Sequence, residues 1–462
     1  MPAAEISSED KGDNRMNLKR FYGMTLATAL SVSMLAGCSG NNNTKDAAAT
    51  AAPASGNAAT ASSEPSQEPV TLKWALWDWE ATAYYKPLID AYKAANPNVT
   101  IEYVDLGSTD YMTMLSTQLS GGADLDVLTI KDIPGYSNLV KQNHLEPLKT
   151  YMGDKSIDPS VYGGTVEQIE VNGEVYALPF RSDFWLIYYN KALFDKAGVD
   201  YPTNDMTFDQ YDELARKMTS GSGSEKVYGA HYHTWRSAVQ LFGILDGKNT
   251  VVGGNYDFLK PTYERILKEQ EDGIVMDYAT LKTSSTHYSG VFYNNSVAMM
   301  NMGSWFIATQ IEKVKSGESQ SAEWGIVKYP HPDGVEAGTT LGTITSLAVN
   351  QKSKHKEAAL DFMNFVTGAE GAKVIASTGT IPAIKNDEVI NSITSIDGFP
   401  ADENSKAALN TVQTYLEMPI HEKSADIEVI LNEAHDNIMT KNATIDEGLK
   451  DMNDRVGQLL NN

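Results

Sequence analysis

A short segment near residue 75 combines tryptophans with carboxylates. It reads WALWDWE and holds three of the chain's seven tryptophans, Trp74, Trp77 and Trp79, together with Asp78 and Glu80. Tryptophan is usually buried and acids are usually exposed, so their mixture is uncommon. Aromatic rings can cover the apolar faces of a ligand, while carboxylates accept hydrogen bonds from its hydroxyl groups. The segment therefore suits a small polar ligand that has both kinds of surface.

Each of these residues also has a structural interpretation. Trp74 alternates with leucines along a predicted strand and is expected in the core. Trp77 and Trp79 either contact the ligand or support the loop from beneath. Asp78 either binds ligand or caps a helix, and Glu80 is favoured as a ligand group.

Further candidate binding residues follow other predicted elements of the chain. They are Asp132, Tyr136, Arg181, Asp183, Trp235, Trp305 and Thr343. Asp132 precedes Pro134, so a helix cap is its alternative role. The alternative role of Arg181 and Asp183 is an ion pair with each other. His231 and His233 are spaced like metal ligands, but zinc needs a third ligand that the sequence does not locate, and no metal site is expected.

The N-terminal 37 residues are not expected to be part of the fold. Lys19 and Arg20 precede an apolar stretch over 21–36, which is too short to span a bilayer and is typical of a signal peptide. Residues 1–15 are interpreted as a candidate spurious extension. Cys38, the only cysteine, follows Leu-Ala-Gly, which resembles a bacterial lipobox; we expect Cys38 to be lipidated and to anchor the protein. Residues 38–69 lack large apolar side chains and are predicted to form a flexible linker.

Length and charge limit the possible functions of the remaining chain. About 390 residues suit two domains better than one, because single cores stop growing near ~250–300 residues. The chain has 37 basic and 60 acidic residues, giving a net charge of −23. Such an acidic protein is not expected to bind nucleic acid.

The order of predicted elements indicates an α/β fold. Strands are expected near 71–77, 99–104 and 125–130, with helices between them, as in a layer built on a parallel sheet. Later strands are expected near 184–190, 296–302, 323–330 and 345–350. Helices are expected at 257–272, 354–367, 405–417, 427–440 and 444–461.

Several ordered segments together resemble the solute-binding proteins of ABC importers, family 1, the carbohydrate-binding group that includes maltose-binding protein. The most specific is NGEVYALPFRSDFWLIYYNKALFDKAGV; others are LKWALWDWE, LSGGADLDVLTIKD, AMMNMGSWF and LGTITSLAVN. One departure is GADLDV, where the family often has Pro-Asp. The resemblance implies a two-lobed α/β fold of the type II periplasmic-binding-protein class, with ligand in a cleft and a hinge between lobes. The N-terminal lobe would comprise 70–181 and 326–380, and the C-terminal lobe 182–325 and 381–462.

The resemblance also implies a function. The chain would be a monomeric, lipid-anchored protein on the outer face of the membrane that delivers a sugar to ABC permease subunits, without catalysis or cofactor. Asp132, Asp183 and Trp305 match positions where the family binds sugar. The alternatives are a non-sugar solute such as a peptide or polyamine, a sensor co-receptor, and a secreted glycosidase or lyase with two positioned carboxylates.

Overall fold

The computed structural model describes residues 68–384 and 386–461. All described elements belong to one unit, Pro65–Asn462. The expected signal peptide, Cys38 and nearly all of the linker lie outside the described residues. No helix within the described ranges combines the length and apolarity needed to cross a bilayer.

The described strands form one sheet. They are β1 (Val70–Leu76), β2 (Val99–Asp105), β3 (Val127–Ile130), β4 (Leu178–Asn190), β5 (Met299–Gly303), β6 (Trp324–Lys328), β7 (Thr339–Val349) and β8 (Gln413–Leu416). Their order is β2-β1-β3-β7-β4-β5, with β6 paired to β4 and β8 to β7. The first three strands are parallel, as predicted, whereas β7 runs antiparallel to β3 and β4.

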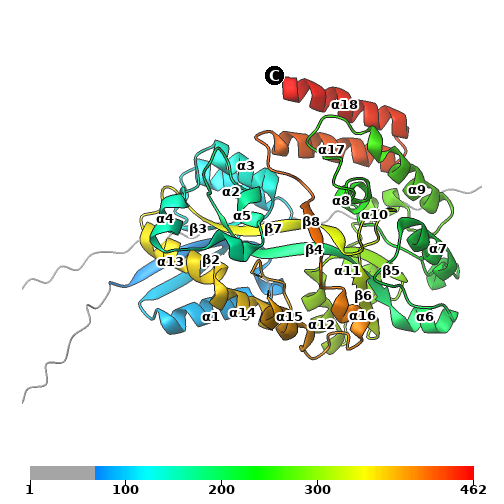
Figure 1. Cartoon of the computed structure of the whole chain (residues 1–462), viewed down its shortest axis with the longest axis horizontal. Helices are drawn as coiled ribbons and strands as arrows, with labels where there is room; N and C mark the ends of the chain where they lie inside the picture. Colours follow the sequence, from blue (N-terminus) through cyan, green and yellow to red (C-terminus); the bar gives the residue numbers. More distant parts are fainter. Residues whose placement is uncertain (1–67, 385, 462) are drawn as a thin grey trace, which may run out of the picture. The chain divides into compact units, whose positions relative to one another are not determined.

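Helices flank this sheet throughout (Figure 1). Those of the first half are α1 (Tyr85–Ala95), α2 (Tyr111–Ser120), α3 (Ile133–Lys141), α4 (Lys149–Asp154), α5 (Thr165–Gln168), α6 (Lys191–Ala197), α7 (Phe208–Met218) and α8 (Ser237–Gln240). They are followed by α9 (Lys260–Glu271), α10 (Tyr278–Thr283), α11 (Tyr288–Tyr293), α12 (Phe306–Lys315), α13 (Lys356–Thr367), α14 (Ala369–Ser377), α15 (Asp387–Thr394), α16 (Glu403–Ala407), α17 (Ser424–Met439) and α18 (Ile445–Asn461).

Two long strands, β4 and β7, connect the two parts of the sheet. The first part of β4 pairs with β7, and from residue 185 onward β4 pairs with β5 and β6. In the same way, β7 pairs with β8 near its start and with β3 near its end. We call the elements around β1–β3 the N-lobe and those around β5–β6 the C-lobe. Both connecting strands are shared, so they are the natural place for a hinge.

Separate hydrophobic cores underlie the two parts. One core joins β1 to α1 and α13 around the fully buried Trp74, whose ring packs edge-on against Tyr85 and Phe362. Another joins the second part of β4 to β5, β6 and α12. A third extends from Trp77 and α3 to α7, α9 and α17. Because β6 packs in the C-lobe core, we propose that the second N-lobe segment begins near β7 rather than at residue 326.

Most predicted elements are present, but one prediction is wrong. Residues 405–417, expected to be a helix, form the short helix α16 and the strand β8. The segment carries Thr414 and Tyr415, which favour strands, and its pairing with β7 cannot be recognised from local periodicity. Local capping signals are obeyed: Thr207 and Gln210, three residues apart, form a capping box at the start of α7.

Candidate functional site

The loop after β1 is held by the neighbouring strand. Asp105, the last residue of β2, accepts hydrogen bonds from the backbone N–H groups of Asp78 (3.2 Å) and Trp79 (3.0 Å). Asp78 adopts a left-handed conformation (φ 50°), which Asp tolerates better than most residues. Its side chain makes no capping hydrogen bond to the following short helix, Trp79–Ala81, in which Glu80 is exposed. The Asp78 carboxylate is therefore not committed to the cap considered as its alternative role.

The two tryptophans of this loop lie against other aromatic rings. The ring of Trp79 is stacked between Tyr103 (3.9 Å between centroids) and Tyr85 (6.1 Å). Trp77 is buried against Tyr111. These contacts correspond to the supporting role considered for both tryptophans, and the covered faces of Trp79 leave it poorly placed to stack on a ligand.

Asp132 and Tyr136 belong to the start of α3. The Asp132 carboxylate accepts a hydrogen bond from the Gly135 N–H at 2.7 Å and caps the helix. Burial raises the pKa of Asp132, against the effect of that hydrogen bond. Tyr136 is 1 % exposed, and its hydroxyl accepts a hydrogen bond from the Tyr176 N–H. Capping uses one oxygen of Asp132, whereas Tyr136 packs in the core.

Arg181 and Asp183 form a buried ion pair on β4, with Arg181 Nε 2.7 Å from Asp183 Oδ2. The register of β4 shifts between Pro179 and Arg181, and from there alternate residues place Arg181 and Asp183 on one face. Asp183 is 0 % exposed and accepts a hydrogen bond from the Ser304 hydroxyl (2.9 Å). This is the pairing considered as their alternative role, and it joins the two lobes because Ser304 follows β5.

The guanidinium group of Arg181 also reaches the N-lobe. It donates hydrogen bonds to the hydroxyls of Tyr84 (2.9 Å) and Thr345 (3.3 Å). Burial opposes its charge, but Asp183 and the neighbouring tyrosines raise the pKa of Arg181. Thr343, half-buried on β7, lies opposite Asp183 in the strand register.

Three aromatic side chains of the C-lobe form a corner beside this ion pair. Trp305 follows β5, Trp235 precedes α8, and Tyr288 begins α11; the ring of Trp235 lies 6.2 Å from Trp305 and 5.6 Å from Tyr288. We call these three residues the aromatic corner. Trp235 is 39 % exposed and Trp305 is partly exposed, so the corner offers apolar surface to a ligand.

The loop after β1 lies within electrostatic range of the aromatic corner. The negative charge of Asp78 acts on both His287 and Tyr288, across a separation of about two hundred residues in sequence. Burial raises the pKa of Tyr288 to about 12, so its hydroxyl remains a hydrogen-bond donor at neutral pH. Tyr288 was not predicted as a site residue, and no sequence signal distinguishes it among the chain's 23 tyrosines.

A second group of polar residues lies where β8 ends. Glu417 Oε2 accepts a hydrogen bond from the Trp185 indole N–H at 3.0 Å, and burial raises the pKa of Glu417 to about 7. Glu428 of α17 forms a bidentate pair with the buried Arg236. The charges of Glu428 and Asp132 both act on Glu417, which places these groups close together. The sequence analysis missed Glu417 because it assigned this segment to a helix.

The predicted site residues thus fall into two sets. Those near the aromatic corner and the ion pair are Asp78, Arg181, Asp183, Trp235, Trp305 and Thr343, whereas Asp132 lies with Glu417 and Glu428. Trp77, Trp79 and Tyr136 lie in supporting positions, and Glu80 is exposed beside the loop. Within the described ranges no three acidic, histidine or cysteine side chains gather as a metal site.

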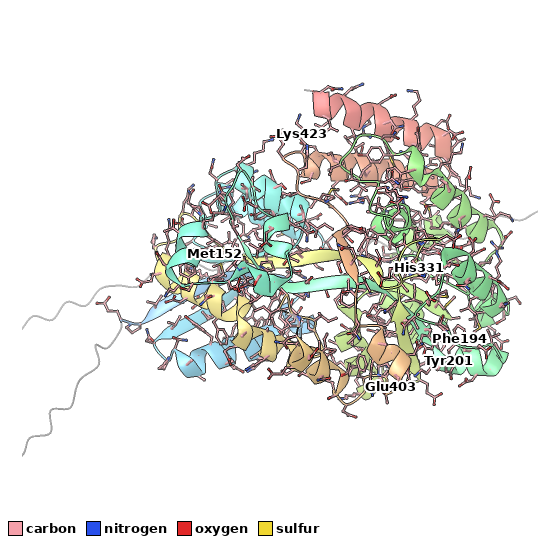
Figure 2. The ribbon with its side chains drawn as sticks, in the orientation of Figure 1. Met152, Phe194, Tyr201, His331, Glu403 and Lys423 are labelled. Carbon is pink, nitrogen blue, oxygen red and sulfur yellow. The ribbon has the colours of Figure 1, made fainter. Side chains whose placement is uncertain are left out.

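The C-terminal helices complete this side of the structure. The Ser424 hydroxyl at the start of α17 donates to the Ser137 hydroxyl of α3 at 3.1 Å, and Lys423, which is labelled in Figure 2, donates to the Leu459 carbonyl of α18. The segment that follows β8 therefore contacts both lobes.

Comparisons with known proteins reveal extensive similarity. Residues 77–373 match the family described as "Bacterial extracellular solute-binding protein". A solved sugar transporter from Rhizobium etli, in an open conformation, is 59 % identical, covers 84 % of this chain and 99 % of its own, and has a TM-score of 0.75. The sugar-binding protein MalE from Xanthomonas citri is 17 % identical over 84 % of this chain and 97 % of its own (TM-score 0.66), which bears on the fold alone. A lactose-binding protein from Rhizobium radiobacter is 25 % identical over 339 residues, 66 % of this chain and 76 % of its own. These similarities confirm the predicted two-lobed α/β fold.

Proposed function

Because this chain belongs to the family of bacterial extracellular solute-binding proteins, we propose that it captures a sugar or oligosaccharide and delivers it to the permease subunits of an ABC importer. The observation that carries the proposal is the aromatic corner of Trp235, Trp305 and Tyr288 beside polar groups from both lobes. A sugar ring has flat C–H faces and a rim of hydroxyls. The exposed indole of Trp235 suits a face, and Asp78, Asp132 and Arg181 suit the rim.

The arginines around the corner do not favour an anionic solute. Arg181 is paired with Asp183, and Arg236 with Glu428. Asp78 and Asp132 form no such ion pair in the described part of the chain, so a polyamine is the main non-sugar alternative. The relatives called sugar transporter and lactose-binding protein support a sugar instead. Peptide and polyamine cargo remain the alternatives, as does service as a sensor co-receptor.

The proposed mechanism is closure of the lobes around the sugar. β4 and β7 connect the lobes, and Asp78 lies in the N-lobe whereas Tyr288 lies in the C-lobe. A sugar that contacts both loops favours the state in which they are close, since a ligand shifts an equilibrium by its differential affinity for the two states. The closed form would then present both lobes to the permease.

No catalytic step is part of this proposal. Of the carboxylates that could serve a hydrolase, Asp183 is held in a buried ion pair, and one oxygen of Asp132 caps a helix. Incubation with the bound oligosaccharide should leave it intact. The appearance of new reducing ends would favour the glycosidase or lyase alternative.

The proposed location is the outer face of the cell membrane, through a lipid on Cys38. This rests on the Leu-Ala-Gly-Cys sequence after the apolar segment. Fractionation of cells that express the Cys38→Ser variant should release the protein from the membrane fraction. Retention of the variant on the membrane would contradict the lipid anchor.

A sugar panel tests the proposed cargo. Thermal unfolding of the full chain is measured with mono- and oligosaccharides, and with spermidine and short peptides as the competing classes. A sugar that binds only the native state should stabilise it by about 2.7 kcal/mol at about 100 times its Kd. Stabilisation by spermidine or peptides, with none by sugars, would contradict the sugar assignment.

A further inference from the structure

A cavity of about 250 Å³ lies in the C-lobe and shares no lining residue with the site described above. Its walls come from α7, α9 and the segment that follows α8, next to Pro332. His331, which is labelled in Figure 2, exchanges backbone hydrogen bonds with Met206 and Phe208 and marks this region. The volume of the cavity is just below the range of about 300–1,000 Å³ that is usual for ligand pockets, so it suits only a molecule of a single ring.

Aromatic rings form much of the wall. They are Phe208, Tyr211, Tyr232, Phe242 and Phe258. Phe208 and Phe242 pack edge to face at 4.8 Å, and Phe242 lies 5.9 Å from Tyr232. These contacts hold the rings in fixed orientations before any ligand arrives, which reduces the entropic cost of binding.

Polar groups stand among the rings. Asp246, Asn249, Thr262 and Arg265 also line the cavity. Arg265 is held by Asp209 (2.8 Å) and lies over the ring of Phe208, so its guanidinium group is oriented. One N–H group of Arg265 donates to Asp209, and a guanidinium group has five, so others can donate to a ligand.

We propose that this cavity is a second binding site, for a single neutral sugar ring, distinct from the aromatic corner. Aromatic walls would cover the C–H faces of the ring, and Asn249 and Arg265 would bond its hydroxyls. A purely apolar molecule would leave these polar groups without partners. A second cavity of about 280 Å³ also borders Asn249 and is lined by Tyr415 and Leu416 of β8.

Two sets of variants separate this site from the aromatic corner. Trp235→Ala/Trp305→Ala removes two sides of the corner. Thr262→Trp places an indole in the C-lobe cavity from the surface of α9, where Thr262 is only partly buried. Glu264→Trp adds the same side chain at an exposed position of α9 outside the cavity and is the matched control.

Saturation-transfer NMR of the full-length variants with D-glucose, D-galactose and D-mannose tests the proposal, with indole as an apolar probe. The Trp235→Ala/Trp305→Ala variant should still bind at least one monosaccharide. Adding Thr262→Trp to that variant should abolish the signal, whereas adding Glu264→Trp to it should not. Circular dichroism confirms the fold; if Thr262→Trp does not fold, Asn249→Ala replaces it and should weaken the same signal.

Three results would overturn the proposal: no sugar signal in the corner variant, a signal that Thr262→Trp leaves unchanged, or a signal with indole alone. The proposed function fails separately. If Thr262→Trp alone abolished all sugar binding, the second site would stand and the corner would not be the cargo site.

Discussion

The ring of Trp305 lies directly over the backbone of Gly303. A β-carbon placed on Gly303 would be 1.9 Å from Cζ3 of that ring, a separation that real atoms do not adopt. The glycine at the end of β5 therefore fixes where the indole rests, beside Trp185 and Trp235. The absence of a side chain at Gly303 thus determines the position of Trp305 in the aromatic corner.

Gly303→Ala should displace Trp305 and weaken cargo binding, with a loss of stability of about 1–3 kcal/mol from overpacking. Isothermal titration and denaturant unfolding measure the two effects. Gly290→Ala is the matched control, because a β-carbon there meets nothing within 4 Å and the position is helical. Unchanged cargo affinity in Gly303→Ala would show that the position of Trp305 does not matter for binding.

Truncation of the aromatic corner should weaken binding strongly. Trp235→Ala and Trp305→Ala should each cost about 2 kcal/mol, or about thirtyfold in Kd, as anchoring aromatics do in other interfaces. Trp79→Ala serves as a comparison, because both faces of that ring are already covered by tyrosines. If both proteins fold and Trp79→Ala loses more affinity than Trp235→Ala, then Trp79, and not Trp235, is the ring that stacks on the sugar.

The buried ion pair of Arg181 and Asp183 should matter chiefly for stability. Asp183→Ala leaves the Arg181 charge without its partner in a buried place, which typically costs about 3–5 kcal/mol. Denaturant unfolding measures this loss, and the Arg181→Met/Asp183→Leu double variant should recover much of it. If Asp183→Ala stays stable and loses only cargo binding, Asp183 is a direct ligand group.

A feature of the structure can be predicted from the sequence when the residues that determine it are neighbours along the chain. The Asp132 cap, the Thr207 capping box and the alternation of β1 are set by neighbours along the chain, and all are present. The covering of Trp79 by Tyr103 depends on the pairing of β1 with β2, which local patterns do not specify in detail. The strand β8 forms because β7 offers it an edge, so Glu417 was missed along with it.

Buried histidines should make the protein sensitive to acid. Burial lowers the pKa of His231 and His435 to about 3 and that of His233 to about 4. The unfolded chain, with values near ~6.5, binds more protons below that pH, so the free energy of unfolding should fall as pH drops from ~6.5 toward ~4.

Unfolding by denaturant at several pH values measures this slope. Each histidine contributes up to about 1.4 kcal/mol per pH unit. His231→Phe should remove its share, since both ring nitrogens of His231 are buried without hydrogen-bond partners in the described part of the chain. The exposed His355→Asn is the control. An equal slope in wild type and His231→Phe would contradict the assignment.

Glu269 should act in the opposite direction. Burial, with help from Asp212, raises the pKa of this fully buried carboxyl to about 8. The folded state holds a proton that the unfolded state releases near ~4.3, so this contribution is complete below that pH and is lost as pH rises toward ~8. Glu269→Gln should therefore be more stable than wild type at pH 9, whereas Glu264→Gln, exposed on the same helix, should not. A Glu269→Gln protein that is no more stable at pH 9 would exclude this role.

The most direct test of the account is the distance between the lobes with and without sugar. Cys38 is the only cysteine, so a Cys38→Ser background with Glu102→Cys on β2 and Glu213→Cys on α7 accepts one spin label on each lobe. Addition of the sugar that stabilises the protein should shift the label-to-label distance distribution toward a single shorter distance, and Trp235→Ala/Trp305→Ala should abolish the shift. A distribution that saturating sugar leaves unchanged would contradict closure around a sugar held at the aromatic corner.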